Sequence, residues 1–262
     1  MKSIDRRAAL CWLAALALAV LGYLGGNAWA LALTQAGRGT TIALYAVNAV
    51  QQTVLFAAPA LLVLAARPGR WRLFCQTLRP LRLDKSADSA LLAVSGSVVV
   101  SILAYLWSLW LQNATGYTGR QDPLPDPENL WQWAVVLLTV VVTPALCEEL
   151  FFRGLIQGAL CRRLGRAGLW LAALVFAALH FRWDAFPSLL LIGLVLGKTY
   201  QLHGYWSSAL LHALYNAVVV VLASREVGVT LGMETACIAA CVVAARRLLR
   251  KEPEDEIDGT GL

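Results

Sequence analysis

The sequence is poor in charged residues, in histidine and in metal-binding motifs. Only 15% of its 262 residues are charged, whereas about a quarter are charged in a soluble domain. The six cysteines form no CxxC pair, so they indicate neither a disulfide framework nor a cysteine metal site. The basic residues lie in short segments between apolar runs, which argues against nucleic acid as a partner. The HExxH signature of zinc proteases is also absent, as is any internal repeat.

Apolar residues are what the sequence has in abundance, at 59% of the chain, together with ten tryptophans. Runs long enough to cross a hydrocarbon core of about 30 Å predict an all-α fold. We expect a polytopic membrane helical bundle of about eight transmembrane helices. The expected spans are 8–25, 40–66, 88–111, 132–156, 167–181, 186–202, 206–223 and 229–245. The fifth is short and the sixth contains Lys198, so these two fit a full crossing least well.

The distribution of lysine and arginine predicts the orientation of these spans. With the N-terminus inside, sixteen basic residues fall in inner segments. Four fall in outer segments, namely Arg38, Arg120, Arg182 and Arg225. Because cytoplasmic loops carry the excess of lysine and arginine, both termini are expected to be cytoplasmic. We therefore expect a multi-pass integral membrane protein, in a bacterial-type inner membrane, with the lipid bilayer as a partner.

The two ends of the chain differ in character. Lys2, Arg6 and Arg7 precede an apolar run, and Asn27-Ala28-Trp29-Ala30 resembles a signal-peptide cleavage site. The run is long for a signal peptide and the chain after it is itself multi-spanning, so we expect the first helix to be retained. Residues 1–251 are expected to form a single membrane domain, and 252–262 a disordered acidic tail.

The stretch Pro144–Leu155 places two carboxylates and an arginine at the end of an apolar run. An ionised carboxylate at mid-membrane depth costs about 2.5–3.5 kcal/mol, so such a cluster needs partners or a position near the surface. At helical spacing Glu149 and Arg153 share a face, whereas Glu148 points elsewhere. The spacing predicts an ion pair between Glu149 and Arg153 and leaves Glu148 available for chemistry.

The chain has three histidines, and two of them lie in apolar helical context. His180 ends an apolar run, four residues after Phe176. His212 lies four residues before Asn216, so the two share one helix face. His203 lies beside a glycine at a predicted helix end, and we expect it to be a loop or cap residue.

These residue types suit the hydrolysis of a peptide bond, which needs an activated water, a proton donor and donors for the oxyanion. Glu148 with a histidine can hold and deprotonate water, while His212 and Asn216 can donate hydrogen bonds to the oxyanion. Glu148, His180 and His212 could equally bind a divalent metal such as zinc, with a position open for water. Both mechanisms stay open, because the residues come from different helices.

Three motifs in order, Glu148-Glu149-x-x-x-Arg153, Phe176-x-x-x-His180 and His212-x-x-x-Asn216, resemble the CPBP family. This family, also called ABI, comprises CAAX-type prenyl endopeptidases and bacteriocin-processing proteins. The resemblance covers roughly 130–222 and implies a catalytic core there.

The resemblance also implies a role for each motif residue. Glu148 with His180 would activate water, and His212 with Asn216 would form the oxyanion side. Glu149 and Arg153 would brace the site, and we expect Phe176 to pack against it. The family has been labelled both metalloprotease and glutamic-type protease, so the resemblance leaves the metal open.

We therefore predict an intramembrane endopeptidase that acts on a membrane-anchored protein or peptide. One alternative is a non-catalytic scaffold or immunity-type protein that keeps the polar cluster for folding. Another is a proton-coupled transporter, which would predict discontinuous helices or paired repeats. One conflict accompanies the prediction: Glu148 falls near the inner end of its expected span, and His180 near the outer end of its own. They can meet only if the fifth helix is short or tilted, or if the helices are displaced in depth.

Overall fold

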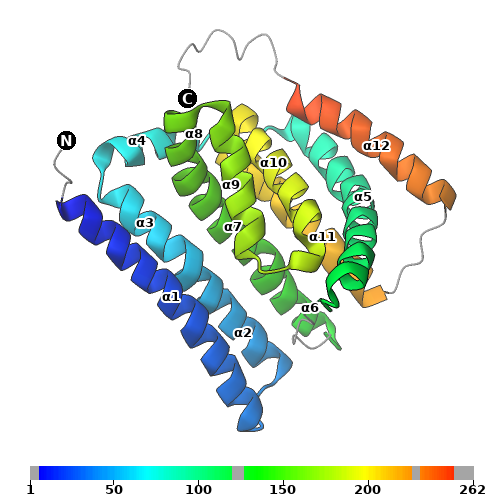
Figure 1. The fold of residues 1–262 in the computed structure, drawn as a ribbon, viewed down its shortest axis with the longest axis horizontal. Coiled ribbons are helices and arrows are strands. Elements are labelled where there is room, and N and C mark those ends of the chain that lie inside the picture. Colours follow the sequence, from blue (N-terminus) through cyan, green and yellow to red (C-terminus); the bar gives the residue numbers. More distant parts are fainter. Residues whose placement is uncertain (1–5, 120–126, 226–230, 251–262) are drawn as a thin grey trace. The chain divides into compact units, whose positions relative to one another are not determined.

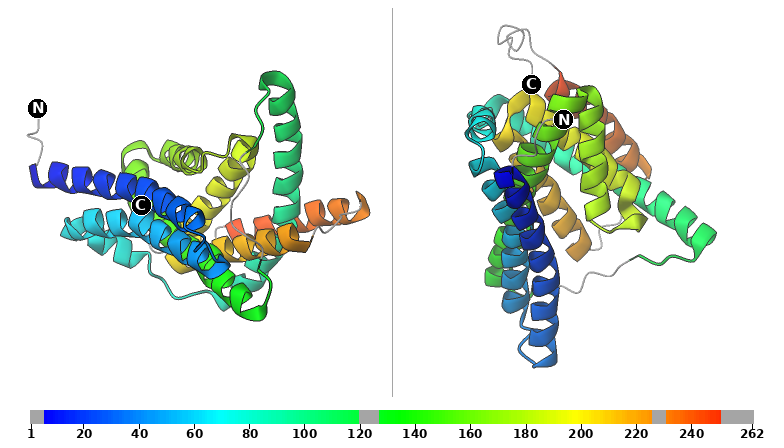
Figure 2. Two further views of the ribbon diagram at one scale, coloured as in Figure 1. Left: turned by 90° about the horizontal axis from the view of Figure 1, so that it is seen from below. Right: turned by 60° about the vertical axis from the view of Figure 1, so that its left-hand side comes forward.

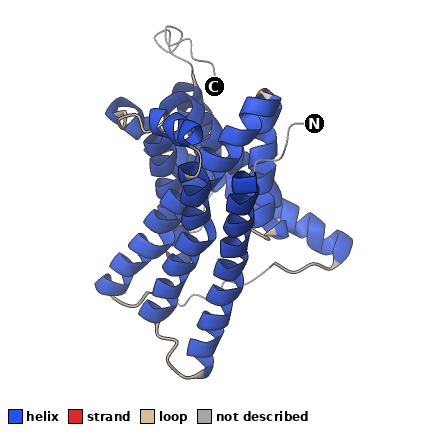
Figure 3. Cartoon of the chain, turned by 90° about the vertical axis from the view of Figure 1, so that its left-hand side faces the viewer, coloured by secondary structure: helices blue, strands red, loops and turns tan. Residues whose placement is uncertain are grey.

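The computed structural model describes residues 6–119, 127–225 and 231–250, and over these ranges the chain consists of helices and connecting loops without a strand (Figure 3). The predicted all-α membrane bundle is therefore confirmed. The acidic tail expected at 252–262 lies outside the described residues.

The chain divides into two compact units, and the predicted single membrane domain stays a prediction. Unit 1 comprises Met1–Leu78 and Pro123–Leu155, and unit 2 comprises Arg79–Asp122 and Ile156–Leu262. The first unit contains α1 (Arg6–Gln35), α2 (Thr41–Gln52), η1 (Thr53–Ala57), α3 (Ala58–Ala65), α4 (Pro68–Gln76), α6 (Leu130–Val136), η2 (Leu137–Val142), α7 (Thr143–Glu148) and most of η3 (Glu149–Gln157). The second contains α5 (Leu83–Thr115), α8 (Gly158–Leu164), α9 (Arg166–Leu179), η4 (Trp183–Ala185), α10 (Phe186–His203), α11 (Tyr205–Arg225) and α12 (Leu231–Leu249) (Figure 1).

Five helical stretches among the described residues are long and apolar enough to cross a membrane. They are Leu13–Gln35, Thr41–Ala65, Lys85–Thr115, Leu130–Leu164 and Trp183–His203. Arg166–Leu179 and Tyr205–Val221 are shorter apolar helices. The chain is thus an integral membrane protein, but the predicted number of eight spans is not confirmed. The cytoplasmic placement of both termini stays a prediction.

In unit 1, α1 lies alongside α2 and α3 (Figure 2). A Cβ atom on Gly22 would lie 2.9 Å from the Leu55 backbone nitrogen, and one on Gly26 would lie 2.6 Å from the Gln51 side chain. Glycines one turn apart allow this close approach of membrane helices. The Gln51 amide donates to the Tyr23 carbonyl at 3.2 Å, so its polar side chain faces a neighbouring helix.

Two prolines account for two widened turns in this unit. Pro59 and Pro144 each stand second in the α-helix that follows a π-helical segment, η1 and η2 respectively. A proline ring clashes with the carbonyl group four residues earlier and removes one backbone donor. Those carbonyls belong to Leu55 and Val140, which lie inside η1 and η2. The wider turns therefore accommodate the prolines within apolar helices.

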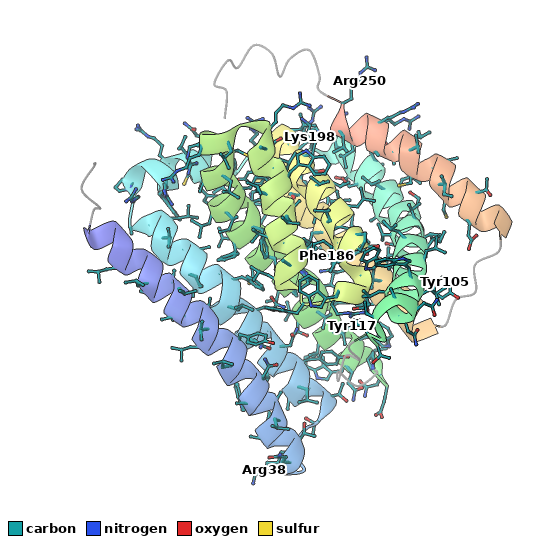
Figure 4. All side chains as sticks on the ribbon, in the orientation of Figure 1. Arg38, Tyr105, Tyr117, Phe186, Lys198 and Arg250 are labelled. Atoms are coloured by element: carbon teal, nitrogen blue, oxygen red, sulfur yellow. The ribbon has the colours of Figure 1, made fainter. Side chains whose placement is uncertain are left out.

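In unit 2, the long helix α5 contacts α10, α11, α12 and η4. The Ser188 hydroxyl of α10 donates to the Val100 carbonyl at 2.7 Å, and the Trp107 indole donates to the Trp183 carbonyl at 2.7 Å. Figure 4 shows Lys198 at the end of this unit where Arg250 lies. That position lets a lysine within an apolar helix extend its ammonium group toward the membrane surface.

Candidate catalytic site

The predicted site residues divide between the two units. Those of unit 1 are Glu148, Glu149 and Arg153, and those of unit 2 are Phe176, His180, His212 and Asn216.

The predicted ion pair is present in unit 1. The Nε atom of Arg153 donates to Oε2 of Glu149 at 3.2 Å, and both side chains are 0% exposed. Removing one partner of a buried pair costs about 3–5 kcal/mol, because the remaining charge is left in a low dielectric. The preceding residue, Glu148, is also buried, with 5% of its surface exposed.

The helix changes its winding directly after Glu148. Residues Glu149–Gln157 form the π-helical segment η3, with no proline to account for the change. Such wide turns occur frequently at functional sites. The sequence predicts the ion pair from α-helical spacing but carries no signal for the π-helix.

Aromatic packing fixes this segment within unit 1. The ring of Phe56 in η1 lies 5.4 Å from the ring of Phe151 and 5.4 Å from that of Phe152. The Thr53 hydroxyl and the Cys147 sulfur lie 4.0 Å apart. The contacts therefore hold the residues on both sides of Glu148 against one neighbouring turn.

In unit 2, the hydrogen bond of His180 determines its tautomer. His180 caps the C-terminus of α9, and its Nδ1 atom lies 2.7 Å from the Phe176 carbonyl oxygen. A carbonyl oxygen can only accept, so Nδ1 carries a proton, and in a neutral ring the acceptor nitrogen is then Nε2. In that tautomer, Nε2 is the atom that can accept a hydrogen bond from water.

The backbone after His180 adopts an unusual conformation. Phe181 has φ 53°, and no other non-glycine residue among the described ones has a positive φ. The His180 backbone N–H donates to the Ala177 carbonyl at 3.4 Å, which leaves the Phe176 carbonyl to accept from the imidazole. A left-handed conformation costs a non-glycine residue about 1–2 kcal/mol, so the helix end beside His180 is strained.

Phe176 connects the two histidines of unit 2. Its ring centroid lies 4.4 Å from that of His180 and 6.1 Å from that of His212, and its side chain is 1% exposed. The structure thus brings Phe176, His180 and His212 together. Asn216 lies one turn beyond the buried His212 on α11 and is half-buried.

Sequence reasoning missed two buried polar residues in unit 2. His203 is the last residue of α10, is 2% exposed, and hydrogen-bonds through Nε2 to the Leu248 carbonyl at 2.6 Å. The prediction that His203 lies at a helix end is confirmed, but its burial was not predicted. Gln157 donates to the Gly197 carbonyl at 2.9 Å. The burial of Gln157 could have been predicted from the sequence, because Gln157 continues the four-residue spacing of Glu149 and Arg153.

A carboxylate and two imidazoles have the right chemistry for zinc. Among the residues that the structure describes, no three His, Cys, Asp or Glu side chains lie close enough together to hold a metal ion. The steps proposed below use no metal ion.

These residues define a class: a helical membrane protein with carboxylates, imidazoles and an amide on its apolar helices. Residues 129–218 match the family described as type II CAAX prenyl endopeptidase Rce1-like. The predicted resemblance is thereby confirmed over a segment that contains all seven candidate residues.

Among curated proteins, the chain is similar to the uncharacterized protein YpbD of Bacillus subtilis (strain 168). The two are 38% identical over 74 residues, or 27% of this chain. The match spans about a third of YpbD, 34% of its length. No solved structure matches the chain.

Proposed function

We propose that this chain is an intramembrane endopeptidase, resembling the CAAX proteases, which hydrolyses a peptide bond in a membrane-anchored protein or peptide. The observation that carries the proposal is the family match at 129–218, because it encloses the motif residues of both units. A bacterial-type inner membrane is part of this proposal.

The helix limits differ from the expected spans on which the conflict in depth rested. The helical stretch expected to end at 156 continues to Leu164, and α9 has only 14 residues, or about 21 Å at 1.5 Å per residue. The turn between them is Gly165, with φ 54°. A Cβ atom on Gly168 would lie 2.5 Å from the Cys161 nitrogen, so α8 and α9 pack closely.

Residues equally far from the turn of a helical hairpin lie at similar depths. Glu148 precedes Gly165 by seventeen residues and His180 follows it by fifteen. A shared depth for the carboxylate and the imidazole is part of the proposal, and the similar counts favour it.

In the proposed reaction, a water molecule binds between the Glu148 carboxylate and Nε2 of His180. The water oxygen attacks the carbonyl carbon of the substrate as its proton passes to Glu148. The C–O bond forms and the carbonyl oxygen becomes an oxyanion. Collapse of this intermediate breaks the C–N bond, and the leaving nitrogen takes the proton from Glu148.

His212 and Asn216 would stabilise the oxyanion. They share a face of α11, so a ring N–H and a side-chain amide can donate to the same oxygen. Removing one such donor typically costs about 10²–10³-fold in kcat. Glu149 and Arg153 would act differently, by holding the helix that carries Glu148 in place.

Cleavage by the purified protein in lipid nanodiscs tests the proposal, with a fluorescence-quenched peptide that carries a lipid anchor as substrate. Glu148→Gln and His180→Ala should each lower kcat by about 10²–10⁴-fold. The matched control is Glu128→Gln, which neutralises an exposed glutamate outside the motifs and should retain wild-type activity. Cleavage that survives both substitutions would refute the assignment to this site.

A further inference from the structure

Gly193 lies on α10, outside the three sequence motifs, and faces α9 at very short range. A Cβ atom placed on it would lie 3.2 Å from both Cα and Cβ of Ala173 and 3.2 Å from Cδ1 of Phe176. Few Cβ atoms in proteins lie that close to another atom, so a neighbouring atom would have to move by a few tenths of an ångström. The absence of a side chain at Gly193 therefore sets how closely α10 approaches α9.

The nearest side chain that could yield is Phe176, because the Ala173 contacts involve its backbone and a single methyl group. On its other sides, Phe176 contacts both imidazoles, at centroid distances of 4.4 Å to His180 and 6.1 Å to His212. Its own carbonyl accepts the Nδ1 proton of His180. A shift of Phe176 therefore changes the surroundings of both histidines.

Helix α9 has little room to move away from α10. Gly168 already lies against the backbone of α8, where a Cβ atom would lie 2.5 Å from the Cys161 nitrogen. Ala172 and Ala173 are fully buried. Small residues at such contacts let membrane helices pack backbone to backbone, and a packed arrangement transmits displacement instead of absorbing it.

We propose that Gly193 is a positioning residue: by carrying no side chain, it fixes the place of the Phe176 ring and, through it, the two imidazoles. All four residues belong to unit 2 and their contacts stand independently of the reaction. Only the catalytic consequence rests on the proposed function.

The histidine content of the chain provides a direct test. With three histidines in all, isotope labelling of histidine gives one set of ring signals for each of them. His203 serves as an internal reference, since its ring is bound to the Leu248 carbonyl. Ring-current shifts depend steeply on distance, so Gly193→Ala should move the signals of His180 and His212 and leave that of His203 unchanged. Gly193→Val should move the same two signals further.

Gly96→Ala on α5 is the matched control, because it adds the same methyl group to a membrane helix. There the new Cβ would make only ordinary contacts, at 3.8 Å from Cys241 Sγ and from Leu92 Cδ1. It should move none of the three signals. Unmoved His180 and His212 signals in folded Gly193→Ala would overturn the proposal, as would an equal shift of His203.

Kinetics separate positioning from general stability. Gly193→Ala should lower kcat about threefold to tenfold, in line with the sensitivity of catalysis to sub-ångström misplacement. The KM should stay within twofold, and the pH profile of kcat should shift. Ala173→Gly/Gly193→Ala, which removes one of the crowding methyl groups, should restore part of the activity.

Two outcomes distinguish this proposal from the proposed function. Moved histidine signals with no cleavage by the wild type would support the positioning role and contradict the protease assignment. If the wild type is active and Gly193→Ala keeps both the histidine signals and kcat, the protease assignment stands and the positioning role of Gly193 is refuted. If Gly193→Val does not fold, Ala173→Gly supplies the opposite perturbation, since it opens space beside Phe176.

Discussion

The imidazole of His180 donates through Nδ1 to the carbonyl oxygen of Phe176, 2.7 Å away and one helical turn earlier. This bond occupies Nδ1, and in the proposed reaction Nε2 is the nitrogen that binds the water. The two nitrogens therefore have separable roles, which substitutions can distinguish.

We expect His180→Asn to keep the fold and lose the activity. The asparagine amide can still donate to the Phe176 carbonyl, but nothing replaces the lone pair of Nε2. We expect kcat to fall by about 10²–10⁴-fold, with little change in the midpoint of thermal unfolding. Retained activity in His180→Asn would show that Nε2 does not handle the water.

Glu149→Gln should destabilise the protein, because it leaves the buried Arg153 without its counter-charge. The expected loss is about 3–5 kcal/mol in the free energy of unfolding. Replacing both partners, as in Glu149→Leu/Arg153→Met, should cost markedly less. Reversible unfolding in mixed micelles measures the wild type, Glu149→Leu, Arg153→Met and the double variant as a double-mutant cycle. A double variant as unstable as the sum of the single ones would argue against coupling between the two side chains.

The strained residue after His180 offers a test of local backbone energy. Phe181 has φ 53° and an exposed side chain. Both Phe181→Gly and Phe181→Ala remove the ring, yet only glycine relieves the left-handed conformation. The glycine variant should therefore be more stable than the alanine variant by about 1 kcal/mol. Equal unfolding free energies would mean that the conformation carries no strain.

Metal removal tests the chemistry of the water. In the proposed steps Glu148 and His180 bind the water without a metal ion, so treatment with a strong chelator, followed by verified removal of bound metal, should leave kcat unchanged. A loss of activity that added zinc restores would instead assign Glu148, His180 and His212 as metal ligands.

The sequence predicts the helical membrane fold because a helix that crosses lipid needs a long apolar run, and such runs are visible. It also predicts the Glu149–Arg153 pair, since four-residue spacing survives even in a π-helix. It misplaces the end of the fourth helix at 156, because polar residues close the apolar run there. The helix nevertheless continues through α8 to Leu164, where Arg162 and Arg163 can reach water.

The features that sequence reasoning could not predict depend on contacts between distant segments. His203 is buried because the Leu248 carbonyl, forty-five residues later, accepts from its ring. Nothing in the sequence distinguishes Gly193 from other helix glycines, because its close contact with α9 depends on how α9 and α10 pack. The grouping of Phe176 with His212 likewise requires α9 and α11 to pack against the same helix, α10, which no spacing along the chain reveals.

The two hydrogen bonds at the ends of α10 show that the matched segment does not stand alone. Ser188 donates to Val100, which precedes the segment, and His203 bonds to Leu248, which follows it. A fragment cut at the family boundaries would lose both acceptors and leave a serine and a histidine desolvated. Helices α5 and α12 thus support the matched segment, although they lie outside it.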